Sequence, residues 1–143
     1  MKEFREKFKI ESLEIKQVGS WIISLRPKQV TLGSMILSLD RKCPHFSELT
    51  AEEGEELSEA FKMLEDLLRS TFSPDKINYL ALMMLDEQVH FHVIPRYKEQ
   101  IVYNNEVYDD AEWPKPPNVL SAIKMSDNVL AELCAKFRKI NKS

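Results

Sequence analysis

The sequence predicts one α+β domain built on an antiparallel sheet. Segments with strand composition occur in two groups, and each group is followed by a segment with helical periodicity, an order typical of α+β domains. The turn signals Gly19-Ser20 and Thr31-Leu32-Gly33 divide the first group into pieces short enough to pair as hairpins. The length of 143 residues is near the common size of one domain.

Composition and charge exclude several classes of protein. Hydrophobic residues make up 43% and charged residues 30% of the chain, as in ordinary globular proteins. A nucleic-acid-binding surface would usually be basic, so the net charge of -3 predicts no nucleic-acid partner. Cys43 and Cys134 lie far apart without metal-ligand spacing, which indicates free thiols in a reducing compartment. Because the N-terminus is charged and no long apolar run follows, we expect a cytoplasmic protein without a membrane partner.

The first group of strands precedes a long helix. Residues 8–16 partly alternate between apolar and polar, which fits a strand or a mixed helix–strand segment. Residues 21–26 predict a strand that Pro27 ends, because proline has no backbone donor for a central ladder. Residues 34–39 predict the next strand, paired with the previous one as a hairpin.

A capping box begins the long helix. The Thr50 hydroxyl can accept from the Glu53 amide, and the Glu53 side chain can return the bond to Thr50. Apolar residues then recur every three or four positions, so one face of the helix can lie on a sheet. These positions are Leu57, Ala60, Phe61, Leu64, Leu67 and Leu68.

The second group of strands starts after residue 76. The strongly apolar residues 77–85 predict a central strand covered on both faces, and Asp86-Glu87 predicts a tight turn into an antiparallel neighbour. These segments complete a core that spans about residues 8–97. Residues 98–125 predict an irregular segment that covers something or has a functional role. Ser126 or Asp127 can cap a C-terminal helix over 126–141.

Two of the three histidines lie within the last predicted strand, residues 88–97. Successive side chains of a strand point to opposite faces. One face therefore carries hydrogen-bonding side chains next to apolar Ile94, and the opposite face is apolar. The first face holds Gln88, His90, His92 and Ile94, and the second holds Val89, Phe91 and Val93.

Three interpretations of the histidine pair remain open from the residues themselves. The imidazoles can be structural and satisfied by hydrogen bonds. They can bind a metal, but a zinc site needs a third protein ligand, from His45, a carboxylate or a cysteine, and no spacing indicates one. One of them can be a nucleophile toward phosphorus, since a pKa near 6.5 leaves a neutral fraction at physiological pH.

Residues 90–96, with the sequence His-Phe-His-Val-Ile-Pro-Arg, resemble the signature of the histidine triad (HIT) superfamily. In that signature three histidines alternate with apolar residues, often before Pro-Arg. Residues 25–37 are similar to the family's hairpin and residues 47–53 to the start of its main helix, so the resemblance covers about residues 20–97 in order. The region around Trp113-Pro114 resembles bacterial members more weakly.

The resemblance implies a HIT-like fold, with a five-stranded antiparallel sheet, a long helix across it and a homodimer formed through that helix and the sheet. It implies a nucleotide-binding protein, a hydrolase or transferase that acts at the α-phosphate of a nucleoside phosphate or dinucleoside polyphosphate through a nucleotidyl-histidine. His90 takes the position of the nucleophile, and the residues implied to bind substrate are His92, Gln88, Arg26 and Ser34. No cofactor is implied, although a divalent cation can arrive with a polyphosphate.

The chain departs from the family pattern at its first triad position, which is Gln88 instead of histidine. Glutamine hydrogen-bonds but does not change charge near pH 7. The predicted Asp86-Glu87 turn leaves no room for the phosphate-binding loop of many family hydrolases. Arg26 replaces a neutral polar residue and either binds phosphate or is simply exposed; Ser34 stands where histidine is frequent. A nucleotide-binding module with little catalysis and a metal-binding pair therefore remain as alternatives.

Overall fold

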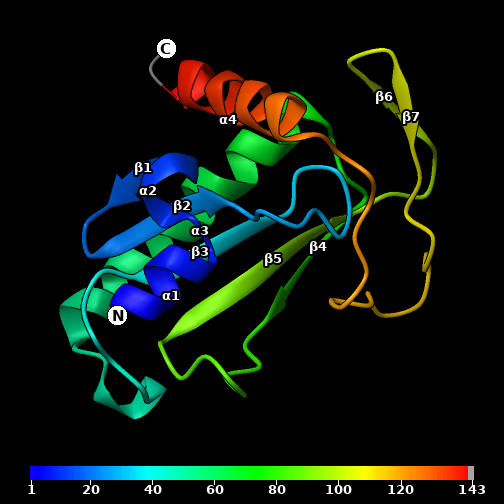
Figure 1. The fold of residues 1–143 in the computed structure, drawn as a ribbon. Coiled ribbons are helices and arrows are strands. Elements are labelled where there is room, and N and C mark those ends of the chain that lie inside the picture. Colours follow the sequence, from blue (N-terminus) through cyan, green and yellow to red (C-terminus); the bar gives the residue numbers. More distant parts are fainter. Residues whose placement is uncertain (142–143) are drawn as a thin grey trace.

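The computed structural model describes residues 1–141 and confirms an α+β domain with a five-stranded antiparallel sheet (Figure 1). Its strand order is β1-β2-β3-β5-β4, and every neighbouring pair is antiparallel. The strands are β1 (Glu14–Val18), β2 (Trp21–Leu25), β3 (Met35–Leu39), β4 (Lys76–Leu80) and β5 (His90–Arg96). The predicted hairpin forms as β2 and β3, with Ile23 opposite Leu37.

Helices lie on both sides of the sheet. They are α1 (Lys2–Lys7), α2 (Ile10–Leu13), the short 3-10 helix η1 (Phe46–Glu48), α3 (Ala51–Thr71) and α4 (Asp127–Asn141). The predicted capping box begins α3: the Glu53 amide donates to Thr50 Oγ1 at 3.1 Å, and the Thr50 amide donates to Glu53 Oε1 at 2.9 Å. Ser126 begins α4, because its Oγ accepts from the Val129 amide at 3.2 Å. Within residues 1–141 we find no helix with the length and apolarity of a membrane span.

The main hydrophobic core lies between the sheet and the pair α3 and α4. Inward side chains of β2 and β3 meet the apolar stripes of both helices there, as the spacing of those stripes predicts. Trp21 is fully buried in this core, and its indole Nε1 donates to the Glu53 carbonyl at 2.8 Å. Other fully buried members are Ile23, Leu25, Met35, Leu37, Leu39, Ala60, Leu64, Leu68, Val89, Val93, Leu133 and Phe137.

A second, smaller cluster covers the opposite face of the sheet. Its members come from the two N-terminal helices and from the outward positions of β2 and β3: Phe4, Phe8, Ile10, Ile22 and Ile36. Residues 8–16, which the sequence left between strand and helix, divide into α2 and β1. In Figure 1 the blue α1 and α2 lie across the sheet from α3.

The prediction of a central strand over 77–85 is wrong. β4 ends at Leu80 and lies at the edge of the sheet, and residues 81–89 form a connection in place of the predicted tight turn. Within it Met84 is 81% and Leu85 91% exposed. An apolar run signals a strand buried on both faces as readily as an edge followed by an exposed apolar loop, so the periodicity could not separate them.

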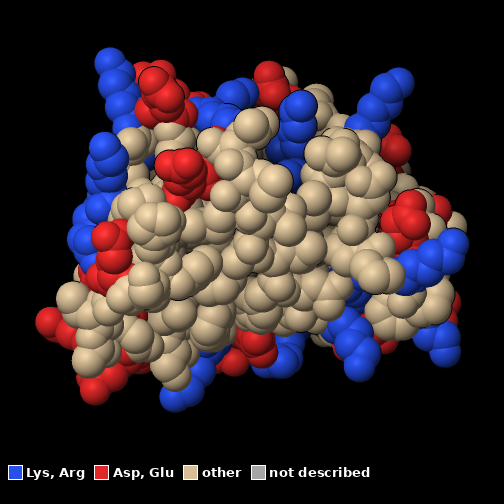
Figure 2. All heavy atoms as spheres, turned by 90° about the horizontal axis from the view of Figure 1, so that it is seen from below, with Lys and Arg blue, Asp and Glu red and all other residues tan. Residues whose placement is uncertain are grey.

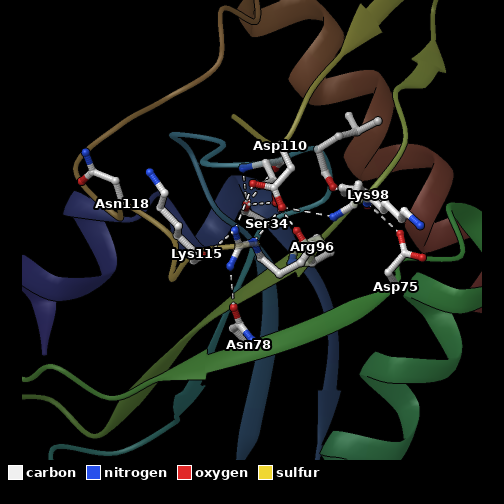
Figure 3. A network of polar contacts seen from close by, with 12 residues as sticks. Ser34, Asp75, Asn78, Arg96, Lys98, Asp110, Lys115 and Asn118 are labelled. Atoms are coloured by element: carbon white, nitrogen blue, oxygen red, sulfur yellow. Dashed lines mark hydrogen bonds and ion pairs between the residues drawn. The ribbon is translucent and has the colours of Figure 1, made fainter. Parts of the chain in front are cut away.

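The segment 98–125 is partly regular, because it contains the ribbon of β6 (Ile101–Tyr103) and β7 (Glu106–Tyr108). A buried ion pair attaches this segment to the sheet (Figure 3). The Arg96 guanidinium at the end of β5 donates to both carboxylate oxygens of Asp110, at 2.7 and 3.1 Å. It also donates to Asn78 Oδ1 at 2.9 Å and to the Lys115 carbonyl at 2.7 Å. Arg96 in the Pro-Arg motif thus fixes the position of the segment that follows.

Candidate active site

The two histidines lie side by side on the face of β5 opposite the main core. Their ring centroids are 5.0 Å apart, which agrees with the alternation seen in the sequence. β5 lies between β3 and β4, with His92 opposite Ile36 on one side and Leu80 on the other. His90 faces Ser38 of β3 and lies beyond the paired end of β4. Neighbouring strands therefore fix the backbone of both residues on a rigid sheet.

The hydrogen bonding of His90 defines its tautomer. Its Nδ1 lies within hydrogen-bond distance of the Gln88 carbonyl, which can only accept, so Nδ1 carries the proton. Nε2 forms no hydrogen bond within residues 1–141 and keeps its lone pair. Burial lowers the pKa of His90, an effect that the Gln88 carbonyl opposes. The neutral ring with a free Nε2 is the form that a nitrogen nucleophile requires.

His92 has the opposite tautomer. Its Nδ1 accepts from Arg26 Nε at 3.3 Å, so the ring proton lies on Nε2. Burial lowers the pKa of His92 to about 4, and the neighbouring His90 and Arg26 contribute in the same direction. His92 is therefore a neutral hydrogen-bond donor next to the neutral ring of His90.

Arg26 is buried beside the histidine pair. It follows β2 directly, and its Nη1 and Nη2 donate to the carbonyls of Lys28 at 2.6 Å and Val119 at 3.2 Å. Burial lowers the pKa of its guanidinium, but an arginine loses its proton only at strongly alkaline pH, so Arg26 stays charged near neutral pH. The interpretation of Arg26 as an exposed strand-end residue is wrong, since the side chain is 8% exposed.

Gln88 and Ser34 both face backbone groups. The two amide protons of Gln88 go to the carbonyls of Leu39 at 2.9 Å and Arg41 at 2.6 Å, and its Oε1 accepts from the Cys43 amide at 3.0 Å. This leaves Gln88 without a free proton for a phosphate oxygen. Ser34 Oγ donates to the Thr31 carbonyl at 2.7 Å and stabilises the turn before β3. Neither side chain forms a hydrogen bond with the histidines in residues 1–141.

The N-terminal phenylalanines belong to this site, and sequence reasoning missed them. Phe4 packs against His90 with ring centroids 5.0 Å apart, and Phe8 lies 6.0 Å from His90 and 5.9 Å from His92. Lys7 Nζ contacts Asp86 Oδ2 at 2.7 Å across the same region. The spacing of Phe4 and Phe8, four residues apart, was a helical signal in the sequence, but the surrounding charges obscured it.

A metal site lacks its third ligand in the part of the chain that the structure describes. Residues 1–141 contain no group of three or more histidine, cysteine, aspartate or glutamate side chains that could hold an ion. The Nδ1 atoms of His90 and His92 are already engaged by Gln88 and Arg26. A zinc centre would need a third protein ligand beside the two histidines.

Comparison with known proteins places the fold of this chain among histidine triad structures. The chain is similar to a histidine triad (HIT) protein from Sinorhizobium meliloti 1021, with a TM-score of 0.71, 21% identity and 92% of both chains covered. It is also similar to the Plasmodium falciparum diadenosine triphosphate hydrolase, with a TM-score of 0.68, 13% identity, and 92% of this chain and 78% of that chain covered. The chain therefore has the histidine triad fold, as the resemblance in the sequence predicted.

One curated protein is similar in sequence as well. It is the bis(5'-adenosyl)-triphosphatase of Dictyostelium discoideum, 24% identical over 117 residues that cover 78% of this chain and 77% of that protein. No protein-family profile matches the chain.

Proposed function

We propose that this protein is a nucleotidyl hydrolase or transferase that acts at the α-phosphate of a nucleoside phosphate or dinucleoside polyphosphate. The observation that carries the proposal is the tautomer of His90, whose Nδ1 proton is held by the Gln88 carbonyl while Nε2 keeps its lone pair. A backbone carbonyl orients the ring and leaves the opposite nitrogen for attack, which is the arrangement that a histidine nucleophile needs.

In the first step His90 Nε2 attacks the α-phosphorus. A bond forms between nitrogen and phosphorus while the bond to the bridging oxygen breaks, and the leaving phosphate departs with that electron pair. The His90 ring carries a positive charge in the nucleotidyl-histidine. The Gln88 carbonyl already accepts a hydrogen bond from Nδ1–H. It stabilises this charge because the hydrogen bond becomes stronger as Nδ1–H becomes more acidic.

In the second step water attacks the same phosphorus. The phosphorus–nitrogen bond breaks and its electron pair returns to Nε2, so His90 regains the neutral form. The attacking water releases a proton to solvent, and the nucleoside monophosphate leaves. Attack by another hydroxyl or phosphate in place of water would give transfer instead of hydrolysis.

His92 and Arg26 stabilise the charge that develops on phosphorus in this mechanism. His92 presents Nε2–H beside His90 and donates to a non-bridging oxygen, where charge increases in the transition state. Arg26 holds that tautomer through Nδ1 and contributes a positive charge close to the phosphate. Arg26 holds His92 in place and does not itself touch the substrate, so it is a positioning residue in this mechanism. Direct binding of substrate by Gln88 and Ser34 stays a prediction from the sequence.

The named relatives support a dinucleoside polyphosphate as the substrate. The similar proteins from D. discoideum and P. falciparum are a bis(5'-adenosyl)-triphosphatase and a diadenosine triphosphate hydrolase. Their low identity leaves the base and the leaving group of this protein's substrate as proposals. A divalent cation would enter with the polyphosphate, and the protein's own residues supply the nucleophile.

We also propose that two copies form a homodimer through β4 and α3. β4 is an edge strand with unpaired backbone groups, which can pair with another chain. Exposed Leu82, Met84 and Leu85 follow it. The view from below in Figure 2 shows a broad area with few charged side chains, on the side where β4 lies in Figure 1. Sedimentation of the wild type and of Met84→Glu tests this: a monomeric wild type would contradict the dimer.

A nucleotide-binding module with little catalysis is the second candidate. It is favoured by Gln88, whose amide cannot donate a proton to a leaving group and whose hydrogen bonds all go to backbone groups. Such a protein would bind nucleotide in the same site but release it unchanged.

Turnover of diadenosine triphosphate separates the two candidates. We expect the wild-type protein to release AMP and ADP. The turnover rate of His90→Ala should be lower by at least about a thousandfold, as is usual when a covalent nucleophile is removed. Replacement of exposed His45 by Asn, Gln or Ala is a matched control and should leave the turnover rate unchanged. Binding of AMP by calorimetry without any release of product would instead favour the binding module.

A further inference from the structure

We propose that residues 2–8, called here the N-terminal lid, close the histidine site and must swing away before a phosphate can reach His90. The lid consists of α1 and Phe8. This inference deepens the proposed function, and its relevance to turnover rests on that function. The closure itself is a property of the fold and can be tested without a substrate.

The contacts of the lid leave no space for a nucleotide at the attacking nitrogen. His90 is 1% and His92 is 7% exposed. Phe4 packs edge-on against His90, and Phe8 contacts both rings. In a reactive complex the phosphorus must lie roughly 3–3.5 Å from the attacking atom. A phosphate with three further oxygens cannot occupy that position while Phe4 and Phe8 remain on the imidazoles.

A hinge separates the lid from the rest of the chain. Lys9 adopts a left-handed conformation with φ 50° and ψ 42°, between the end of the lid and the start of α2. Ile10, the next residue, is fully buried against Ile22 and Ile36 and anchors the chain to the sheet. A single residue between a short helix and a fixed anchor can absorb a large change in φ and ψ, as hinge residues do. The lid can therefore rotate about Lys9 while α2 stays in place.

Three ion pairs join the lid to the rest of the domain. One of them, between Arg5 Nε and Glu11 Oε1 of α2 at 2.6 Å, spans the hinge itself. Lys7 Nζ contacts Asp86 Oδ2 at 2.7 Å, on the connection between β4 and β5. Arg5 Nη1 contacts Asp40 Oδ1 at 3.1 Å, just after β3. The Lys7 side chain is 51% exposed, so solvent and salt screen its pair with Asp86, and the pair contributes little. Pairs of this kind favour the closed state but can break when the lid opens.

The Lys7–Asp86 pair also explains how an acidic residue can lie close to the predicted phosphate site. An unpaired carboxylate there would repel a polyphosphate. In the closed state Lys7 neutralises Asp86. When the lid opens, Lys7 leaves with it, and Asp86 becomes available to a cation that accompanies the phosphates.

Chemical modification of the histidines measures lid opening directly. Diethyl pyrocarbonate acylates accessible neutral imidazoles, and the protein carries exposed His45 as an internal reference. We expect His90 and His92 to react far more slowly than His45 in the wild type, as followed by peptide mass spectrometry above pH 7. Lys7→Glu and Asp86→Lys should each raise the rates at His90 and His92 about two- to fivefold relative to His45, the range for losing an exposed ion pair.

Charge reversal provides the control for this experiment. The double variant Lys7→Glu/Asp86→Lys restores opposite charges and should return the rates toward those of the wild type. Lys2→Glu makes the same charge change in the same helix, and Lys2 forms no ion pair within residues 1–141, so it should have no effect. Phe4→Ala should raise the rates further than either single charge variant, because it removes the ring that covers His90.

Two results would contradict the proposal that the N-terminal lid closes the histidine site. One is a wild-type protein in which His90 reacts as fast as His45. The other is a set of charge variants and Phe4→Ala that react at the same rates as the wild type. Because acylation needs no substrate, these outcomes are independent of whether diadenosine triphosphate is hydrolysed. An inactive protein whose variants open as expected would contradict the proposed function and leave the lid intact.

Discussion

The two faces of the sheet are covered in different ways. On one face α3 and α4 bury a large apolar core around Trp21 and Phe137. On the other face two short helices bury five apolar side chains together with His90 and His92. Buried apolar area supplies most of the stability of a domain, so the first face holds the fold together. The second cover is small enough to move, and it lies over the histidine pair.

Core truncation on the two faces should give the largest contrast. Phe137→Ala leaves a cavity in the main core and should lower the free energy of unfolding by about 3–5 kcal/mol. Phe4→Ala should cost roughly 2 kcal/mol or less, because a lid that opens leaves no enclosed cavity. Urea denaturation followed by circular dichroism measures both. Equal losses would show that the N-terminal cover is as firmly fixed as the main core.

Ion pairs that differ in burial should also differ in their contribution to stability. The Arg96–Asp110 pair is buried, with side chains 4% and 2% exposed, so Asp110→Asn leaves an uncompensated guanidinium and should cost about 3 kcal/mol or more. The Arg5–Glu11 pair lies in the N-terminal region with Glu11 75% exposed. Glu11→Gln should leave the midpoint of denaturation unchanged. If both variants unfold at the same denaturant concentration, burial does not distinguish the two pairs.

Features of the fold that depend on local sequence patterns were predicted correctly. The histidine strand followed from alternation alone, because Phe91 and Val93 had to face the core if His90 and His92 faced away. The capping box fixed the start of α3 to the residue, since Thr50 and Glu53 stand at the required spacing. These signals are local, and local geometry decides them.

Other features depended on contacts distant in sequence. The local sequence does not show whether the Gln88 side chain binds phosphate or donates hydrogen bonds to the carbonyls of Leu39 and Arg41, which are more than 40 residues away. The edge position of β4 depends on strand order, which an apolar run does not encode. The lid was hidden because α1 carries charges at most positions and shows its function only where Phe4 meets His90.

Stability should depend on pH through the histidine face. The pKa of His92 is lowered from 6.5 to about 4, so the unfolded chain binds the proton first as the pH falls below 6.5. The folded state is therefore stabilised above pH 6.5, and this contribution is lost as the pH falls toward 4. His92→Gln should flatten the dependence in that window, measured by thermal unfolding at a series of pH values. An unchanged slope would contradict the buried, neutral state of His92.

The smallest effect should appear in the pH dependence of turnover. Protonation of His90 removes the attacking lone pair, and burial lowers its pKa, so kcat/KM should persist below pH 6.5 before it falls. The charge of Arg26 lowers the pKa of both histidines. Arg26→Met should therefore move the acid limb to higher pH and lower kcat, whereas Arg26→Lys should restore the position of the limb in part. A purely structural role for Arg26 would reduce the amount of folded enzyme without moving the limb.

In the proposed mechanism His90 becomes covalently bonded to the substrate's phosphorus. Mixing the protein with diadenosine triphosphate, quenching in alkali and mapping the peptides by mass spectrometry tests it most directly, because phosphorus–nitrogen bonds to histidine survive alkali. We predict an adenylyl group on the peptide that contains residues 90–96, present with the wild type and His92→Ala and absent with His90→Ala. Turnover with no adduct at any quench time, or an adduct that persists in His90→Ala, would rule out His90 as the nucleophile.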